Sequence, residues 1–433
     1  MKAPGVYVTE RPSGAYTISG ASTSTPAFIG GVAHGTDNVP VLIRSWTEYK
    51  DRFQQSSLDM SYPLDDDTQD HNPVDDAIER NPADDTHDQA PGTAAVEEGV
   101  DTQSSNPRPE PVAFMEEALY GFFANGGSRC YIVAIPNAAL TGTSLDAALT
   151  ALTAVQDVSM VSFPSLWAKW GTSNPAQPSD DVAKTLQENL VKHCSDLADR
   201  VAILDPKPGL TDQQVLEFRS PMGRKPFGTL YYPWITVPGV TGTPITIPPS
   251  GHVAGVWART DATRGVFKAP ANEALDGVSS LAFTLTDNTQ GPLNQQGINA
   301  LRAFPGQGLL VWGARTLAAE SDTDWRYLNV RRYVSFLRRS ILNGTRWAVF
   351  EPNDERLWAA LRRTVATFLT DQWRTGALQG QTAADAFYVV CDDTNNTPAS
   401  ITAGQVHCDI GVAIVRPAEF VEFTVTQIIE QPS

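Results

Sequence analysis

The chain has 433 residues, of which 41% are hydrophobic and 9% aromatic, and its formal net charge is −17. This length exceeds what one hydrophobic core usually organises, so we expect two domains, or one domain with a large insertion. The sequence has no apolar run long enough for a membrane helix and no cluster of Lys and Arg, which argues against membrane insertion and nucleic-acid binding.

The first element predicted in chain order is a short strand in the sequence GVYVTE. Val6 and Val8 alternate with Tyr7, and a Pro-Ser-Gly turn follows. No hairpin partner lies nearby in the sequence, so the strand needs a partner from elsewhere. The segment also lacks the apolar core of a secretory signal, so we expect no Sec-type export.

Residues 23–53 are predicted to begin an α/β domain. Two short apolar runs, residues 27–32 and 39–43, are predicted strands. Ser45 and Glu48 then have the spacing of a capping box, which predicts a short helix that ends near Phe53.

Residues 54–111 form an acidic insertion. Between Ser56 and Glu110 there are 15 acidic residues against Arg80 and Arg108, a local charge of −13, which leaves −4 for all other residues. A segment so polar and poor in aromatics buries too little apolar area to offset the entropy of ordering, so we expect disorder. It lacks the Gly and terminal Glu of an EF-hand loop, which favours a solvated segment over a metal site.

Residues 112–308 are predicted to form an outer α/β domain. Helices near residues 112–124, 145–155 and 180–197 alternate with apolar strands in CYIVAI, VSMVSFP and RVAILDP. This alternation is typical of a layer of parallel strands. Residues 231–249 are strand and turn material interrupted by three prolines.

Residues 309–433 are predicted to form a C-terminal domain. We expect strands in LLVWGARTL and RWAVFEP, a helix over residues 325–342, and a second long helix capped by Asn353. Three more strands follow, in AFYVVCD, QVHCDIGVAIV and FVEFTVTQII. In the last of these, four apolar residues share one face: Val421, Phe423, Val425 and Ile429.

The usual signatures of catalysis and nucleotide binding are absent from the sequence. Gly30 and Gly35 have the spacing of a phosphate loop, but Thr36 and Asp37 follow where Lys and Ser or Thr should be. No GxSxG or HxxxH pattern occurs, and the four cysteines have no metal-ligand spacing, so we interpret them as reduced packing residues. We expect no catalytic residue, no cofactor and no metal site.

His252 is the best single candidate for chemistry. It lies in PPSGHVAG, a Gly- and Pro-rich stretch, with Arg259, Asp261 and Arg264 downstream. A structural interpretation is favoured, in which a turn histidine and an Arg/Asp set fix a loop through charge-assisted hydrogen bonds.

Eight segments together resemble the contractile tail sheath family of phage tails, tailocins and extracellular contractile injection systems. They are PGVYVTERPSG, STSTPAFIGGVAHGTDNVPVLIRSWTEY, YGFFANGGSRCYIV, IPPSGHVAGVWARTDATRGVFKAPAN, LNQQGINALRAFPGQGLLVWGARTL, WRYLNVRRYV, FEPNDERLW and VRPAEFVEF. Each is weak alone, but eight in this order are specific. The acidic insertion departs from the compact members of the family.

The resemblance implies a mixed α/β sheath subunit of two domains, with a discontinuous core domain, an inserted α/β domain and terminal β-strand arms. Residues 1–22 would be the N-terminal arm and linker. The arms would add strands to sheets of neighbouring subunits, as β-augmentation requires. Our candidates for these arms are Val6, Tyr7, Val8, Val421, Phe423, Val425 and Ile429.

The resemblance also implies a structural function without an enzyme activity. The subunit would polymerise with itself in stacked rings around an inner tube protein, contact baseplate and terminal cap proteins, and contract from a metastable extended state. A sheath paralogue as further partner stays open. We expect assembly in the cytoplasm, with release by lysis if the particle works outside the cell. The alternatives are a baseplate or cap component and, in another class, a soluble α/β enzyme.

Two arginine-rich helices are candidates for the tube contact, because their side chains could pair with an acidic tube surface. A solvated arginine face is the alternative interpretation. The residues concerned are Arg331, Arg332, Arg338, Arg339, Arg356, Arg362 and Arg363.

Overall fold

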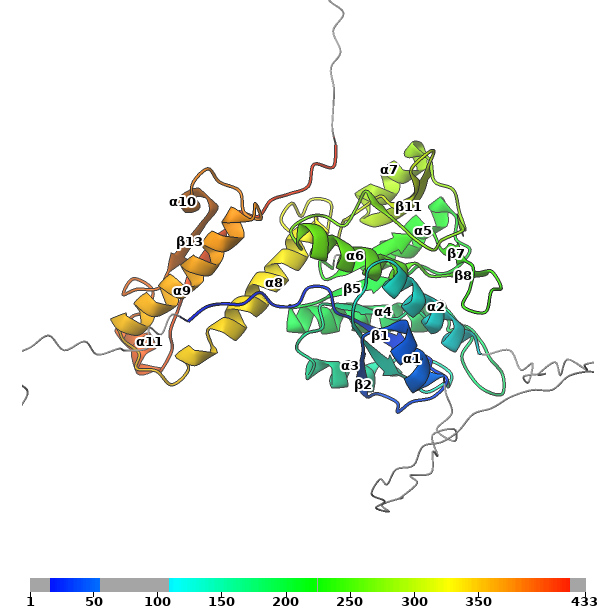
Figure 1. The fold of residues 1–433 in the computed structure, drawn as a ribbon, viewed down its shortest axis with the longest axis horizontal. Coiled ribbons are helices and arrows are strands. Elements are labelled where there is room, and N and C mark those ends of the chain that lie inside the picture. Colours follow the sequence, from blue (N-terminus) through cyan, green and yellow to red (C-terminus); the bar gives the residue numbers. More distant parts are fainter. Residues whose placement is uncertain (1–15, 55–108, 224, 421–433) are drawn as a thin grey trace, which may run out of the picture.

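The computed structural model describes residues 16–54, 109–223 and 225–420. They form a larger α/β part and a smaller part, bridged by the long helix α8 (Leu328–Gly344) (Figure 1). The mixed α/β class predicted from the sequence is confirmed. Nearly all of the acidic insertion lies outside the described residues. So do all seven candidates for the arms: Val6, Tyr7, Val8, Val421, Phe423, Val425 and Ile429.

A nine-stranded sheet forms the centre of the larger part, in the order β2-β3-β1-β4-β5-β6-β11-β12-β9. The inner pairings from β3 to β11 are parallel, whereas β2, β12 and β9 join antiparallel at the edges. Inner strands such as β1 and β5 are buried at every position, because a parallel sheet is covered on both faces. The strands are β1 (Pro26–Gly30), β2 (Pro40–Ile43), β3 (Cys130–Ala134), β4 (Met160–Ser162), β5 (Val201–Leu204), β6 (Gly228–Tyr232), β9 (Glu273–Ala274), β11 (Ile298–Phe304) and β12 (Gly308–Val311).

Helices cover the sheet, and a small second sheet, β10-β7-β8, lies beside it. The short strands are β7 (Ile235–Val237), β8 (Ile245–Ile247) and β10 (Ser280–Leu281). The helices of the larger part are α1 (Trp46–Phe53), α2 (Glu110–Ala124), α3 (Asp146–Thr153), α4 (Asp180–Leu197), α5 (Asp212–Arg219), α6 (Ser250–Arg264) and α7 (Asp287–Gln295).

Helices α2 and α6 pack closely because glycines line their contact. A Cβ added at Gly251 would lie 2.4 Å from the carbonyl oxygen of Ala118, and one at Gly121 would lie 2.0 Å from the ring of His252. Real Cβ atoms do not come so close to other atoms, so only glycine permits this backbone approach.

The smaller part consists of α8, α9 (Glu355–Arg374), α10 (Ala383–Ala386), α11 (Pro398–Thr402) and a two-stranded antiparallel sheet of β13 (Phe387–Val390) and β14 (Asp409–Val412). Its core joins the apolar faces of α8 and α9 to the sheet, with Tyr333, Val365 and Leu369 at most 1% exposed. Among the described residues, this cluster is separate from that of the larger part, and a third, smaller cluster around Leu357, Trp358 and Cys391 lies at the other end of α9.

Three sequence predictions for this region are wrong in detail. RWAVFEP is not a strand: residues 346–348 form a short 3₁₀ helix, and Val349 and Phe350 are exposed, with no strand paired to them in the part of the chain that the structure describes. Asp354 rather than Asn353 caps α9, since its side chain accepts from the Leu357 backbone N–H at 3.0 Å. Residues 309–311, predicted to begin the C-terminal domain, belong to β12 and pair with β11 in the central sheet.

Candidate assembly surfaces

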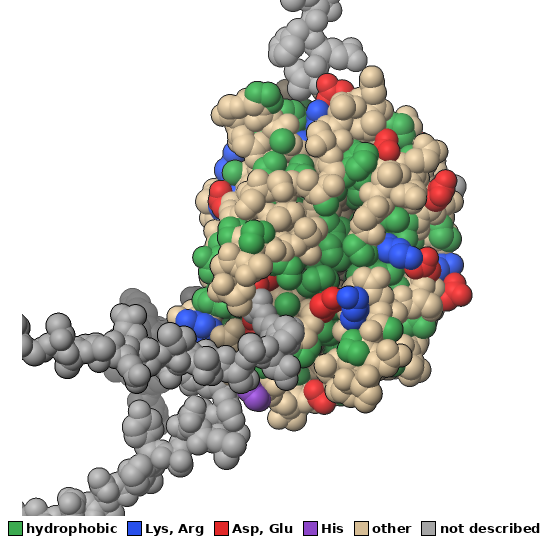
Figure 2. Space-filling view, turned by 90° about the vertical axis from the view of Figure 1, so that its right-hand side faces the viewer, with side chains coloured by type: hydrophobic (Ala, Val, Ile, Leu, Met, Phe, Trp, Pro, Cys, Tyr) green, Lys and Arg blue, Asp and Glu red, His purple; other side chains and the backbone are tan. Residues whose placement is uncertain are grey.

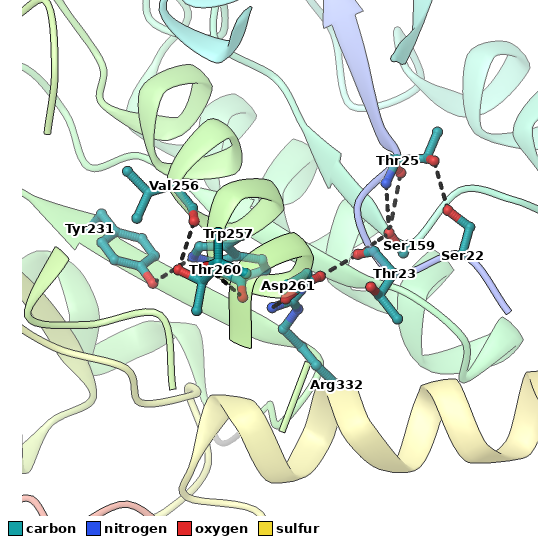
Figure 3. Close-up of polar contacts among 11 residues, drawn as sticks. Ser22, Thr23, Thr25, Ser159, Tyr231, Val256, Trp257, Thr260, Asp261 and Arg332 are labelled. Atoms are coloured by element: carbon teal, nitrogen blue, oxygen red, sulfur yellow. Dashed lines mark hydrogen bonds and ion pairs between the residues drawn. The ribbon is translucent and has the colours of Figure 1, made fainter. Parts of the chain in front are cut away.

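A buried ion pair joins α8 to α6. Arg332 on α8 faces Asp261 on α6, with 2.5 Å between Nη2 and Oδ2, and both side chains are 3% exposed (Figure 3). The guanidinium also lies 4.6 Å from the centre of the Trp257 ring and donates to the carbonyl oxygen of Thr23 at 3.0 Å. Arg332 therefore connects α8, α6 and the segment before β1 at one point.

Residues 16–25 run along α8 in the direction opposite to the helix. Tyr16 stacks on Trp347 with ring centres 3.9 Å apart, and the Ala21 N–H donates to Ser340 Oγ at 2.9 Å. Gly344 permits contact with Ile18, since a Cβ there would come within 2.5 Å of that side chain. The segment thus crosses from the smaller part to β1 (Figure 1).

Its last residues are fixed to the central sheet. Ser159 Oγ donates to the Thr23 carbonyl oxygen at 2.6 Å, the Thr25 N–H donates to Ser159 Oγ at 3.2 Å, and the hydroxyls of Ser22 and Thr25 lie 2.8 Å apart (Figure 3). The chain is therefore held along the whole distance between Tyr16 and β1.

The other end of the described chain is fixed by a second ion pair. The Arg315 guanidinium donates to both carboxylate oxygens of Glu419, at 2.8 and 2.5 Å, and Asn294 Nδ2 donates to Glu419 Oε1 at 3.0 Å. A two-point Arg–carboxylate contact restricts orientation as well as position. Just beyond it, Phe420 is 74% exposed.

A cavity of about 870 Å³ lies beside the C-terminal segment of the described chain. It is lined by residues 415–420 and by side chains of the larger part, including Trp312, Arg302 and Asp287. Asn329 on α8 donates to the Val415 carbonyl oxygen at 3.1 Å. The described C-terminal segment therefore contacts the start of α8, whereas Tyr16 contacts Trp347 just beyond the end of α8.

The β13–β14 sheet has only two strands among the described residues, so both of its outer edges are free of sheet partners there. Phe387, Val389 and Ile410 pack toward the helices, while Tyr388 is 59% exposed. The Tyr388 ring covers Gly411 on the neighbouring strand, where a Cβ would lie 2.1 Å from the ring. Exposed strand edges are the structures to which further strands add.

The structure divides the seven arginines predicted to contact the tube. Arg331 and Arg332 are 5% and 4% exposed, so their side chains are not on the surface, and the prediction is wrong for them in this fold. Arg331 lies between the rings of Phe227 and Trp325, at 4.3 and 4.2 Å. This burial lowers the pKa of Arg331 to about 10, which leaves it charged at neutral pH.

Three more of these arginines bond the protein itself. Arg338 donates to the Leu197 carbonyl oxygen at 2.6 Å, and Arg339 contacts Asp199 and Gln156. Arg362 donates to the Cys391 carbonyl oxygen at 3.0 Å.

Arg356 and Arg363 are exposed, seven residues apart on one face of α9, with no ion pair to any described residue. They are the members of the set that a partner can reach without breaking contacts.

The prediction that His252 lies in a loop turn is wrong. His252 lies near the N-terminus of helix α6 and is 2% exposed. Its ring packs against Gly121 on α2, and burial lowers its pKa to about 4, so the ring is neutral at physiological pH. Arg259, from the Arg/Asp set that we expected to fix a loop, does so: it donates to Asp276 Oδ2 at 3.0 Å and contacts the carbonyl oxygen of Ala274.

No group of three or more metal-ligating side chains is placed to hold an ion in the part of the chain that the structure describes. Nor does any helix in residues 16–54, 109–223 and 225–420 combine the length and hydrophobicity needed to cross a bilayer.

Figure 2 shows one end face of the protein, where apolar side chains gather in the middle and charged ones lie mainly around them.

Two family models match the chain in succession: the phage tail sheath protein central domain over residues 138–317, and the phage tail sheath C-terminal domain over residues 320–428. The chain belongs to the phage tail sheath family. The resemblance inferred from the eight sequence segments is therefore confirmed, and the central-domain model covers β4, α6 and the central strands up to β12.

Individual sheath proteins agree with this assignment. The tail sheath protein of Vibrio phage KVP40 is 30% identical over 180 residues, which are 41% of this chain and 25% of that protein. The chain thus spans about a quarter of this curated relative. It is also 29% identical to the tail sheath protein of Burkholderia phage BcepMu, in a match that covers 51% of this chain and 48% of that protein.

The fold matches a solved sheath over its full length. The PVC sheath, from an extracellular contractile injection system in the contracted state, is 28% identical with a TM-score of 0.71, and the match covers 99% of both chains.

Proposed function

We propose that this chain is a structural subunit that polymerises as a helical sheath around the inner tube of a contractile injection system or phage-like tail. It drives the tube through a target envelope when the sheath contracts from a metastable extended state. The observation that carries the proposal is the match to the contracted PVC sheath over 99% of both chains, which leaves no large part of either chain unaccounted for.

The geometry of the chain ends supports linkage between subunits. Residue 16 and residue 420 are each fixed to the folded body, at opposite ends of α8, by the Tyr16–Trp347 stack and the Arg315–Glu419 pair. We propose that the residues beyond these two points act as arms that bind different neighbouring subunits. The open edges of the β13–β14 sheet are the acceptors that we propose for such arms.

The strength of such a link follows from its hydrogen bonds. A donated strand of about six residues makes roughly five backbone hydrogen bonds, each contributing about 0.5–1.5 kcal/mol net. The sum, roughly 3–7 kcal/mol, is enough to keep neighbouring subunits connected while their bodies rotate. Energy for contraction is stored at assembly, so the function needs no nucleotide site.

The proposed partners are further copies of the subunit, an inner tube protein, and baseplate and cap proteins. The relatives are parts of phage tails or of an extracellular contractile injection system. We propose assembly in the cytoplasm, with release by lysis if the particle works outside the cell.

A second candidate is a baseplate component, because a chain in the baseplate structure of the anti-feeding prophage also matches, with 27% identity, a TM-score of 0.70 and coverage of 99% of this chain and 100% of that one. The enzyme alternative has no comparable support, since the relatives are structural proteins.

Negative-stain electron microscopy tests the sheath proposal. The purified full-length chain, mixed with its tube protein, should form hollow cylinders with transverse striations. A Val6→Pro/Val8→Pro variant loses the backbone donors that a donated strand needs and should not form them. Val6→Ala/Val8→Ala keeps the donors and should still assemble. Discrete small particles in every sample would contradict the sheath proposal and favour the baseplate component.

A further inference from the structure

Two cysteines stand opposite each other where the β13–β14 sheet ends. The strands pair antiparallel with Val390 opposite Asp409, so the next position along the ladder places Cys391 opposite Cys408. The 16 residues between them in the sequence conceal this proximity, because the intervening loop contains α11 and leads the chain back.

The hydrogen-bond pattern identifies the kind of position that they occupy. The Ala413 N–H donates to the Ala386 carbonyl oxygen at 2.8 Å, so this is a hydrogen-bonded pair of the ladder. Bonded and non-bonded pairs alternate along an antiparallel ladder, which makes Cys391 and Cys408 a non-bonded pair. In agreement, the Cys391 carbonyl oxygen accepts from Arg362 instead.

Non-bonded pairs bring opposite Cα atoms to about 4.5 Å, the closest approach in an antiparallel sheet. Disulfides need Cα atoms roughly 4.4–6.8 Å apart, so the backbone at this position already satisfies the covalent geometry. The thiol of Cys408 is within hydrogen-bonding reach of that of Cys391, and burial together with this neighbour raises the pKa of Cys408 to about 12.

The surrounding loop is built to hold this register. Asn396, 2% exposed, donates from Nδ2 to the His407 carbonyl oxygen at 2.9 Å and accepts from the His407 N–H at 2.7 Å. It thereby replaces the next pair of ladder bonds with a side-chain amide. Cys391 is fully buried beside Trp358, whereas Cys408 is partly exposed, so one thiol of the pair is open to reagents.

We propose that Cys391 and Cys408 form a cross-strand disulfide when the protein meets a small-molecule disulfide, and so constitute an oxidation-dependent staple of the smaller part. The proposal does not depend on the sheath function. It changes the interpretation of these two cysteines as packing residues, which their spacing in the sequence had suggested.

The chemistry proceeds by two exchanges. The partly exposed Cys408 loses its proton and attacks one sulfur of oxidised glutathione, which forms a mixed disulfide and releases one glutathione thiol. Cys391 then loses its proton and attacks the Cys408 sulfur, which closes the protein disulfide and releases the second glutathione thiol. The two protein thiols are oxidised, one molecule of glutathione disulfide is reduced, and the two protons pass to the released thiols.

The buried setting makes this reaction slow. Burial raises the pKa of both thiols, so at neutral pH only a small fraction of Cys408 is the reactive thiolate. The pair is therefore suited to a lasting structural bond rather than to rapid redox sensing. Its rate of closure should rise about tenfold for each pH unit between 7 and 9, as the thiolate fraction does.

Peptide mapping by mass spectrometry tests the proposal on the full-length chain. The reduced protein is incubated with oxidised glutathione, acid-quenched, denatured and alkylated. The expected product is a peptide pair linked through Cys391 and Cys408 in most molecules, lighter by two hydrogen atoms than the reduced peptides. Cys130 and Cys194, on β3 and α4, should remain alkylatable thiols and serve as internal controls.

Two variants make the outcome decisive. Cys391→Ser should stop the reaction at a glutathione adduct on Cys408, and Cys408→Ser, at the partly exposed position, should leave Cys391 reduced. Oxidation should also raise the melting temperature of the wild type by several degrees, with no change in Cys408→Ser. A stable glutathione adduct on wild-type Cys408, or free thiols at both positions after oxidation at pH 9, would overturn the proposal.

Discussion

Arg332 and Asp261 form a buried ion pair at the point where α8 meets α6. Each of the two side chains is 3% exposed. Taking two charges out of water is costly, and the contact compensates only because the guanidinium also lies on Trp257 and bonds the Thr23 carbonyl oxygen. The pair therefore fixes how the smaller part is attached more than it adds to stability.

Replacing one member of this pair should be far more damaging than replacing both. Arg332→Met leaves the Asp261 carboxylate buried without its partner, and we expect a loss of about 3–5 kcal/mol in the free energy of unfolding. Arg332→Met with Asp261→Asn should recover much of this loss. Urea unfolding of the three proteins measures both. A double variant as unstable as the single one would show that the packing of Arg332, not its charge, is what matters.

The glycine contact between α2 and α6 should tolerate no side chain. Gly251→Ala would place its Cβ 2.5 Å from the Ala118 Cα, and backbone cannot yield as a flexible side chain does. We expect about 1–3 kcal/mol of destabilisation from overpacking. Gly142→Ala, whose Cβ would have its closest contact at 3.4 Å, is the control and should change stability by about 0.5 kcal/mol or less. Equal effects in thermal unfolding would contradict this account.

The protein should lose stability as the pH falls, in part through His252. Burial lowers its pKa from 6.5 to about 4, so between these values the unfolded chain binds a proton that the folded protein does not. The contribution is present above pH 6.5 and is lost toward pH 4, up to about 3 kcal/mol. His252→Asn should flatten this part of the stability curve, whereas the exposed His34→Asn should not. Parallel curves for all three proteins would refute the assignment.

The anchor of the C-terminal segment should depend on charge. Glu419→Gln keeps the shape of the side chain but weakens its two-point contact with Arg315, and we expect thermolysin to cleave near Phe420 about tenfold faster, with little change in the melting temperature. Arg416→Gln is the control, because its contact with Asp324 is long, 3.4 Å, and exposed. Similar cleavage rates in both variants would rule out a special role for Glu419.

The tube contact that we propose for α9 now rests on Arg356 and Arg363. Reversing both to Glu should weaken binding to the purified tube several-fold and reduce its dependence on salt, because the charges meet at an exposed surface. Arg374→Glu, on the same helix and 70% exposed, is the matched control. Unchanged sheathing of the tube by the double variant would leave the solvated-face interpretation.

The elements with a strong local signal could be predicted from the sequence. The apolar runs of β1, β3 and β5 and the amphipathic faces of α4, α8 and α9 lie within a few residues of their expected positions. At Ser45 the expected cap is present, with the Glu48 N–H donating to Ser45 Oγ at 3.0 Å, but the Glu48 carboxylate accepts from the Arg44 N–H rather than from Ser45. Composition and periodicity report such local preferences directly.

The assembly surfaces could not be predicted from the sequence, because they depend on long-range contacts that local sequence patterns do not report. Arg331 and Arg332 resemble Arg338 in the sequence, and only the packing of Trp257, Phe227 and Trp325 against α8 distinguishes buried from exposed. RWAVFEP has the composition of a strand, but none of the described strands pairs with it, and tertiary context overrides the local preference.

The antiparallel course of residues 16–25 along α8 has a mechanical consequence. A pull on residue 16, directed away from the larger part, loads the Tyr16–Trp347 stack, the Gly344–Ile18 contact, the Ala21–Ser340 hydrogen bond and the Thr23–Arg332 bond in shear, all at once. Contacts loaded together resist far more force than contacts peeled one after another. In a sheath linked as we propose, tension from a neighbouring subunit would be spread over α8 and would reach the central sheet before either part unfolds.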